Sequence, residues 1–150
     1  MKHARVLIAD NDRRLRAQLY TRLLDIEVFS DSVSNISDAM EYMRDRKYGL
    51  VLLDLELPNG EAYGLIDQIR LLALVDRPMI LATASRDLQP TIDPDLVQII
   101  MRKPLRLADV ADMIRSCLHS AIDAMSASDK RANGRIELTG GDEQPVRVVG

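Results

Sequence analysis

The sequence predicts an α/β fold built on a doubly wound parallel sheet of five strands. Three observations lead to this prediction. Short apolar runs alternate with segments of helical period, the most apolar run shows no polar alternation, and polar side chains follow the ends of several runs. Alternating strands and helices are typical of parallel sheets with right-handed crossovers. A strand that is apolar throughout is typical of a sheet covered on both faces.

The first strand is predicted over residues 5–9, directly before Asp10-Asn11-Asp12. A helix follows, because leucines recur every four residues from Leu15 to Leu23 and therefore share one face. Residues 26–29 are apolar enough to predict the second strand.

A second helix is predicted from Ile36 to Met43, where apolar residues follow the spacing of an amphipathic helix. Residues 49–53, Gly-Leu-Val-Leu-Leu, form the most apolar run and predict the third strand. Asp54 ends this strand, and in open parallel sheets ligands bind outside the carboxyl ends of the strands.

A turn is predicted at residues 58–60, Pro-Asn-Gly, followed by a third helix with apolar residues from Leu65 to Leu72. Residues 78–82 and 97–101 predict the fourth and fifth strands, and a long helix follows from Leu107 to Met125. Between these strands, residues 85–95 contain Pro90 and Pro94. Proline in a helix interior costs about 3 kcal/mol, so we expect the fourth helix to be short or missing.

The amino-acid composition argues against several classes of function. The net charge of −3 argues against a general binder of nucleic acid or of membrane surfaces. Aromatic residues make up 3% of the chain, which is too few for a platform that stacks bases. No apolar stretch approaches the roughly 20 residues of a membrane span. The single cysteine, Cys117, fits a reducing compartment, and we expect a cytoplasmic location.

The sequence becomes polar and linker-like after residue 125. Residues 1–125 are expected to form one domain, and residues 126–150 a polar linker or tail that is either disordered or a small hairpin. The tail is too short for a DNA-binding or enzymatic domain. The chain is therefore expected to be a stand-alone domain or a fragment of a larger protein.

The carboxyl ends of the predicted strands are expected to bring carboxylates, a hydroxyl and a lysine ammonium close together. Asp10, Asp54, Thr83 and Lys103 each follow or end a strand, and in a parallel sheet these ends share one edge. Clustered carboxylates repel one another unless a cation neutralises them, and oxygen ligands suit Mg²⁺. A carboxylate beside Mg²⁺ and a lysine can accept a phosphoryl group.

Over residues 4–125 the chain resembles the receiver domain of two-component response regulators. Four motifs carry the resemblance: residues 6–12 (VLIADND), 52–58 (LLDLELP), 80–84 (ILATA) and 101–105 (MRKPL). The resemblance implies a flavodoxin-like sheet of strand order 2-1-3-4-5. It also implies a phosphorylatable signalling switch rather than an enzyme that processes a metabolite.

The resemblance assigns a role to each residue of the cluster. Asp54 is the implied phosphoacceptor, Thr83 the switch hydroxyl and Lys103 the phosphate-binding lysine, in a peptide bond to Pro104 that is commonly cis. Asp10, Asn11, Asp54 and the carbonyl of Glu56 are the implied Mg²⁺ ligands. The implied partners are a sensor histidine kinase or phosphotransfer protein and a downstream protein target or fused output domain, without direct contact to nucleic acid or membrane. Homodimerisation stays open.

Three departures from the family pattern leave an alternative open. Asn11 stands where the family usually has a second acid, so we expect weak Mg²⁺ binding. Met101 lies in the predicted fifth strand, where the family usually has a Tyr or Phe, and the fourth helix is weak. The alternative is a pseudo-receiver that signals without phosphorylation. A flavin-binding protein of the same strand order is disfavoured, because no glycine-rich loop follows the first strand.

Overall fold

The computed structural model of the protein describes residues 4–120. Five strands are present: β1 (Val6–Ala9), β2 (Ser30–Val33), β3 (Leu50–Asp54), β4 (Met79–Ala84) and β5 (Val97–Arg102). The helices are α1 (Arg13–Asp25), α2 (Ile36–Asp45), α3 (Glu61–Arg70), the short 3₁₀ helices η1 (Pro58–Gly60) and η2 (Leu74–Asp76), and a helix over residues 107–120. Within this part of the chain, no helix is both long and apolar enough to cross a membrane.

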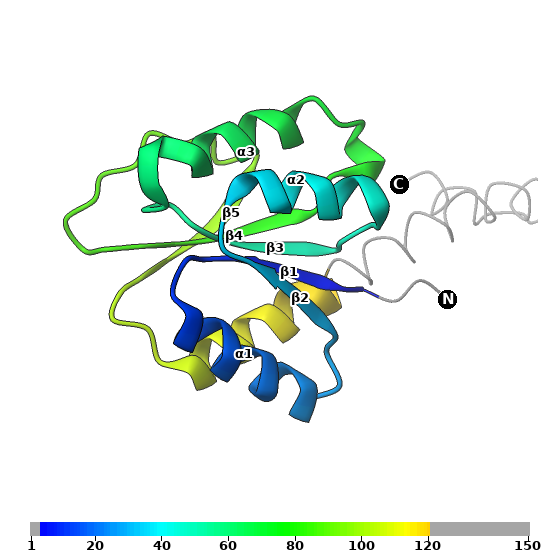
Figure 1. Ribbon diagram of the computed structural model, residues 1–150, viewed down its shortest axis with the longest axis vertical. Helices are drawn as coiled ribbons and strands as arrows, with labels where there is room; N and C mark the ends of the chain where they lie inside the picture. Colours follow the sequence, from blue (N-terminus) through cyan, green and yellow to red (C-terminus); the bar gives the residue numbers. More distant parts are fainter. Residues whose placement is uncertain (1–3, 121–150) are drawn as a thin grey trace, which may run out of the picture. The chain divides into compact units, whose positions relative to one another are not determined.

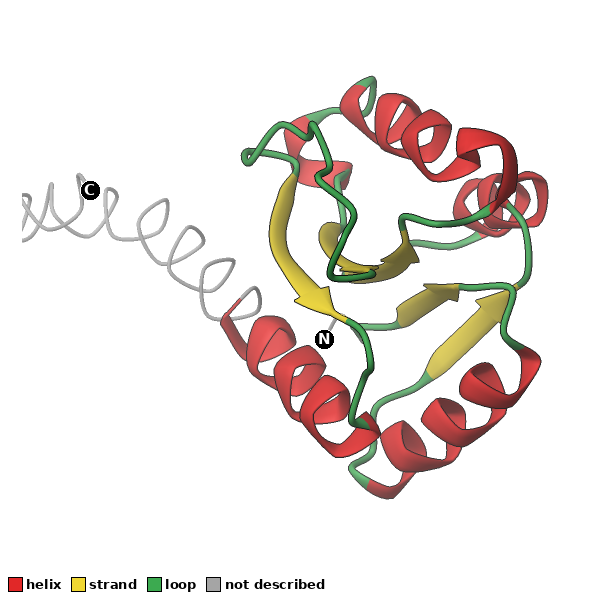
Figure 2. Cartoon of the chain, turned by 90° about the vertical axis from the view of Figure 1, so that its left-hand side faces the viewer, coloured by secondary structure: helices red, strands yellow, loops and turns green. Residues whose placement is uncertain are grey.

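The five strands form one sheet in the order β2-β1-β3-β4-β5, and every neighbouring pair is parallel. The predicted fold class is therefore confirmed. In the β3–β4 register Asp54 lies opposite Thr83. All carboxyl ends lie at the edge that is on the left in Figure 1, where α1 begins, and Figure 2 views the sheet from this edge.

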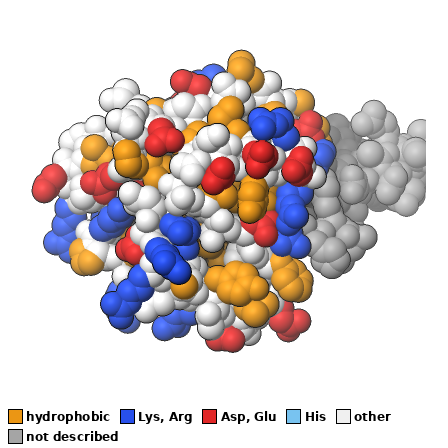
Figure 3. Space-filling model, in the orientation of Figure 1, with side chains coloured by type: hydrophobic (Ala, Val, Ile, Leu, Met, Phe, Trp, Pro, Cys, Tyr) orange, Lys and Arg blue, Asp and Glu red, His pale blue; other side chains and the backbone are white. Residues whose placement is uncertain are grey.

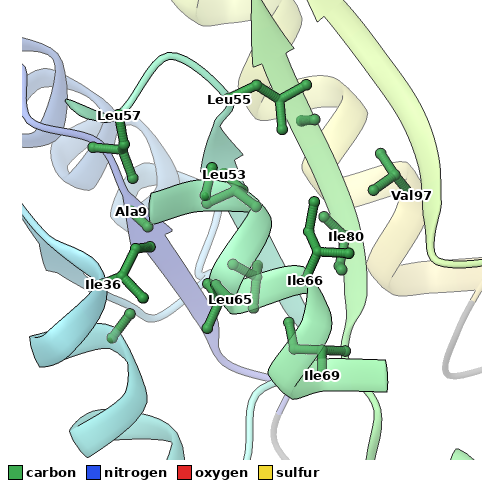
Figure 4. Packing of buried hydrophobic residues seen from close by; sticks show 14 of the residues in the cluster. Ala9, Ile36, Leu53, Leu55, Leu57, Leu65, Ile66, Ile69, Ile80 and Val97 are labelled. Atoms are coloured by element: carbon green, nitrogen blue, oxygen red, sulfur yellow. The ribbon is translucent and has the colours of Figure 1, made fainter. Parts of the chain in front are cut away.

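Helices cover both faces of the sheet, and each face has its own apolar core. On one face α2 and α3 bury Ile36, Leu65, Ile66 and Ile69 against the strands, as Figure 4 shows. On the other face α1 and the 107–120 helix pack Leu19, Leu23, Val110 and Ile114 against β1, β3 and β4. This two-sided burial explains why β3, with the sequence LVLLD, is apolar up to its final residue.

Capping side chains determine where α1 and α2 begin. Asp12 is the N-cap of α1, and its carboxylate accepts hydrogen bonds from the backbone N–H groups of Arg14 and Leu15 at 3.0 and 3.1 Å. Asn35 caps α2 in the same way, accepting from the N–H of Asp38 at 2.8 Å. The cap at Asp12 fixes the path of the chain directly after Asp10.

The predicted second strand is wrong in position. Residues 26 and 27 form the turn after α1, in which Glu27 adopts a positive φ of 60°, and residues 28 and 29 lead from this turn into the strand, which is Ser30–Val33 instead. Ile26 and Val28 pack beside the α1 core without joining the sheet. β2 is an edge strand in which only Ser30 and Val33 are buried, so its sequence, SDSV, lacks the apolar run on which the prediction relied.

The connection between β4 and β5 contains no helix in residues 85–96, as the two prolines predicted. β4 itself extends two residues further than expected, so Thr83 and Ala84 are its last residues. The predicted domain boundary at residue 125 and the linker or hairpin of residues 126–150 lie outside the described residues.

Candidate functional site at the carboxyl edge of the sheet

Asp54 is a buried carboxylate at the carboxyl end of the central strand β3, with only 3% of its surface exposed. One of its oxygens, Oδ1, accepts a hydrogen bond from the backbone N–H of Glu56 at 2.9 Å. The same oxygen accepts from the Lys103 ammonium at 3.1 Å. Asp54 is thus oriented by its own chain and neutralised by one cation.

Lys103 reaches Asp54 from the segment that follows β5. Its backbone N–H donates to the carbonyl of Ala84 at 2.8 Å, and its peptide bond to Pro104 is cis. Burial alone would lower the pKa of Lys103, but the hydrogen bond and charge of Asp54, with the charge of Asp10, raise it above its ordinary value. Lys103 is therefore a permanent cation at physiological pH.

Asp10 is the second buried carboxylate of the site, with 4% of its surface exposed. Its Oδ1 accepts from the backbone N–H of Asp12 at 2.8 Å, and its backbone carbonyl accepts from the Arg16 guanidinium at 2.7 Å. Burial raises the pKa of Asp10; the Asp12 N–H opposes this shift, and the charge of Asp54 adds to it. The site thus holds two repelling carboxylates.

Thr83 lies beside Asp54 on the neighbouring strand and is 1% exposed. Its hydroxyl is buried and has no hydrogen-bond partner among residues 4–120. Buried hydroxyls usually have a partner, and an unpaired one costs free energy. This hydroxyl is therefore free to donate to a group that binds next to Asp54.

Glu56 contributes its side chain to the site, in addition to the backbone carbonyl that the sequence analysis assigned to it. Its Oε1 accepts from the backbone N–H of Ser85 at 2.9 Å and lies 3.4 Å from the Lys103 ammonium. Hydrogen bonds from Ser85 and then the contact with Lys103 lower the pKa of Glu56, although partial desolvation opposes them. The Lys103 ammonium is thus shared between two carboxylates.

The oxygen donors at this edge fit Mg²⁺, although only two of them, the carboxylates of Asp10 and Asp54, carry a negative charge. Within residues 4–120, no three His, Cys, Asp or Glu side chains gather closely enough to hold a metal ion by themselves. Asp10 and Asp54 supply two buried carboxylates whose repulsion a cation would relieve. The amide of exposed Asn11 and the carbonyl of Glu56 are the further oxygen donors nearby in the chain, and Mg²⁺ usually completes its shell with water.

Three side chains make hydrogen bonds at this site that were not predicted from the sequence. Glu56 accepts from the N–H of Ser85, Arg16 donates to the carbonyl of Asp10, and Arg102 donates to the carbonyls of Ser85 and Leu88. The contacts of Glu56 and Arg102 depend on how loops fold over the sheet edge, which periodicity does not encode. The contact of Arg16 depends on where the first turn of α1 lies beside Asp10. The only sequence signal was position, since Arg102 directly precedes Lys103 and Glu56 lies two residues after Asp54.

Residues 6–115 match the family described as the response regulator receiver domain. Among curated proteins, the chain is 27% identical over 145 residues to a probable transcriptional regulator, ycf27, of Porphyridium aerugineum. The alignment covers 92% of this chain and 58% of that protein, so the chain spans little more than half of its relative.

Solved structures show the same fold. A response regulator receiver domain (CheY-like) from Methylobacillus flagellatus superposes with a TM-score of 0.63 at 24% identity, covering 77% of this chain and 99% of that one. A sensor protein from Polaromonas sp. JS666 superposes with a TM-score of 0.66 at 26% identity, covering 83% and 99%.

Proposed function

Because the chain belongs to the response regulator receiver domain family, we propose that it accepts a phosphoryl group on Asp54 from a phosphohistidine of a sensor kinase or phosphotransfer protein. As a receiver domain it is a signalling module rather than a conventional enzyme. In this proposal it acts in the cytoplasm, and phosphorylation changes its contacts with a downstream protein or a fused output domain.

The observation that carries the proposal is the pairing of Asp54 with Lys103. A buried carboxylate at a sheet edge holds a lysine ammonium at 3.1 Å, and the charge of a second buried carboxylate, Asp10, helps to raise the pKa of Lys103. A structural ion pair at this place would not need the second acid, whose burial is unfavourable. The arrangement suits a site that binds a further cation and an anionic substrate.

In the transfer step, an Asp54 oxygen attacks the phosphorus of phosphohistidine. A P–O bond forms, the P–N bond breaks, and its electron pair stays with the imidazole nitrogen. Lys103 pairs with the negative charge of the phosphoryl oxygens, and the Thr83 hydroxyl donates a hydrogen bond to one of them. Hydrolysis of the aspartyl phosphate then restores the carboxylate.

Asp10, Asp54, Asn11 and the Glu56 carbonyl are the groups that would hold Mg²⁺ in this proposal. When bound, Mg²⁺ neutralises charge on the carboxylates and on the incoming phosphoryl oxygens. Asn11 contributes an oxygen without charge, so we expect Mg²⁺ to bind more weakly than in a site with a third carboxylate.

The surface near the acceptor suits an anionic phosphodonor. Arg13 and Arg14 are exposed in the first turn of α1, which begins three residues after Asp10. Lys and Arg side chains gather on the lower left of the face in Figure 3, the side on which α1 begins in Figure 1. Positive potential of this kind raises the local concentration of a phosphorylated donor.

Incubation with acetyl phosphate and Mg²⁺, read by intact-protein mass spectrometry, tests this function. We expect one phosphoryl adduct on the unmodified chain and none on an Asp54→Asn variant. An unmodified chain that gains no adduct, from acetyl phosphate or from sensor kinases tested in turn, would contradict the proposal.

A pseudo-receiver that signals without phosphorylation is the second candidate. Asn11 in the metal site and the absence of a helix in residues 85–96 favour it. The Thr83 hydroxyl, which has no partner among the described residues, and the Lys103–Asp54 pair weigh against it. Neither feature is required in a module that does not bind a phosphoryl group. The same mass measurement separates the two candidates.

A further inference from the structure

The Arg102 side chain holds the start of the segment that joins β4 to β5, which contains no helix in residues 85–96. The Nη1 atom of Arg102 donates to the carbonyl of Ser85 at 2.9 Å and to the carbonyl of Leu88 at 2.6 Å. Further along, Leu88 and Ile92 pack against the core on the α2–α3 face. The first turn of the segment, residues 85–88, therefore depends on polar contacts made at the edge of the phosphoacceptor site.

Ser85 is held by charged side chains on both sides of its backbone. Its N–H donates to the Glu56 carboxylate at 2.9 Å, and its carbonyl accepts from Arg102. Glu56 in turn lies 3.4 Å from the Lys103 ammonium, which lies 3.1 Å from Asp54. An unbroken series of polar contacts thus links the acceptor carboxylate to the segment between β4 and β5.

We propose that Ser85 transmits the phosphorylation state of Asp54 to residues 85–92, because Glu56 releases the Ser85 N–H when Asp54 carries a phosphoryl group. This inference rests on the proposed function, since it needs phosphorylated Asp54. The release has an electrostatic cause: Asp54 and Glu56 share one ammonium, and a phosphoryl group makes the charge at Asp54 more negative.

The more negative acceptor has two effects on Glu56. It draws Lys103 away from the Glu56 carboxylate, and it repels that carboxylate directly. The Glu56 side chain is 36% exposed, so it can turn into water without a large desolvation cost. Ser85 then loses one of its two anchors, and only Arg102 holds the start of the segment.

Two other elements that could carry the signal are missing from residues 85–102. β5, with the sequence VQIIMR, contains no aromatic side chain that could change position with Thr83. Residues 85–96 contain no helix that could shift as a rigid unit. The polar contacts of Ser85 connect the acceptor to this segment through Glu56 and Lys103.

Hydrogen–deuterium exchange of the full chain tests the proposal. Peptides covering residues 85–92 are compared before and after treatment with acetyl phosphate and Mg²⁺, while intact mass gives the phosphorylated fraction of the same sample. We expect exchange in these peptides to rise at least about threefold on phosphorylation, as expected when a backbone hydrogen bond opens locally.

Two variants identify the groups responsible. Glu56→Gln keeps an oxygen that can accept from Ser85 but has no charge to be repelled, so the rise per phosphorylated molecule should fall below half of the unmodified chain's. Arg102→Gln should raise exchange in residues 85–92 before phosphorylation, with the adduct still formed. Arg77→Gln is the matched control, because Arg77 also donates to two backbone carbonyls, those of Leu72 and Arg70, and should leave this segment unchanged.

The outcomes separate this inference from the function on which it rests. A phosphoryl adduct with unchanged exchange in residues 85–92, or an equal rise in Glu56→Gln, would overturn the role of Ser85 and leave the proposed function standing. No adduct on any variant would overturn both. An adduct with the expected rise, reduced in Glu56→Gln, would support the transmission through Ser85.

Discussion

Asp10 and Asp54 are two buried carboxylates that share the influence of one lysine ammonium. Burial and the neighbouring charge of Asp54 raise the pKa of Asp10, so the folded state favours its protonated form. The resulting cost to stability is absent below the pKa of an unfolded aspartate, about 3.9. It grows as the pH rises through the folded-state pKa and is constant above that.

Replacing Asp10 with Asn should therefore stabilise the protein at neutral pH. We expect a gain on the order of 1–3 kcal/mol in the free energy of unfolding at pH 7, because the change removes a buried charge whose desolvation the Asp12 N–H and Lys103 only partly offset. Urea unfolding in EDTA at several pH values measures it, and the gain should shrink as the pH falls toward 4. Asp12→Asn is the control, since Asn caps a helix as well as Asp does and should change little. A loss of stability in Asp10→Asn at pH 7 would contradict the electrostatic description of the site.

Lys103 should be required for phosphorylation because it is the only Lys or Arg side chain that pairs with Asp54 in the described residues. Lys103→Met should slow adduct formation from acetyl phosphate by at least about a hundredfold, the usual effect of losing one group that stabilises transition-state charge. Lys47→Met is the control, since Lys47 pairs with the exposed carboxylate of Asp76 at the opposite edge of the sheet. Equal rates in the two variants would remove Lys103 from the mechanism.

Asn11 should limit the affinity for Mg²⁺. Restoring a carboxylate with Asn11→Asp adds a charged oxygen ligand, and we expect about tenfold tighter Mg²⁺ binding because affinity rises with ligand charge. Isothermal titration calorimetry with MgCl₂ measures both proteins. Equal affinities would show that Asn11 does not define the metal site.

At the scale of the elements, the edge strand β2 is stabilised by a polar cluster around Asp31. The Asp31 carboxylate accepts from the Tyr48 hydroxyl at 2.6 Å, from Arg46 at 3.0 Å and from Arg5 at 3.4 Å. These contacts tie the strand to the loop before β3 and to the residue before β1. They compensate for a strand sequence that offers little apolar surface.

Tyr48→Phe should cost about 1 kcal/mol of stability, the usual contribution of one hydrogen bond. Burial, followed by the hydrogen bond and charge of Asp31, raises the pKa of Tyr48 well above that of an ordinary tyrosine. The contribution is therefore complete below about pH 10 and is lost as the pH rises further. Thermal unfolding at pH 7 compares this variant with Tyr42→Phe, a change at an exposed tyrosine that should have no effect. Equal melting temperatures for the two variants would contradict the role of the Asp31 cluster.

The sequence was informative where burial decides the structure and misleading where it does not. The central strand β3 is buried along its whole length, and its apolar run gave its position correctly. The edge strand β2 is half exposed and polar, so the apolar residues 26–29 drew the prediction to the turn instead. Glu27 has a positive φ there, which interrupts an extended chain and which no apolar pattern signals.

At the scale of the whole molecule, the parallel sheet explains why residues far apart in sequence meet at one edge. Asp10, Asp54, Thr83 and Lys103 follow from the rule that strand ends converge, and this part of the site could be predicted. The contacts of Glu56 with Ser85 and of Arg102 with Ser85 and Leu88 could not, because they depend on the paths of two irregular loops.

The central claim is that Asp54 is the residue that accepts the phosphoryl group. Reduction of the phosphorylated chain with borohydride, followed by peptide mass spectrometry, tests it most directly, because an aspartyl phosphate is converted to homoserine at the modified position. The proposed function predicts homoserine at Asp54 and unmodified aspartate at Asp10 and Asp12. Homoserine at either of those positions, or at no position in a chain treated with phosphodonor and Mg²⁺, would contradict it.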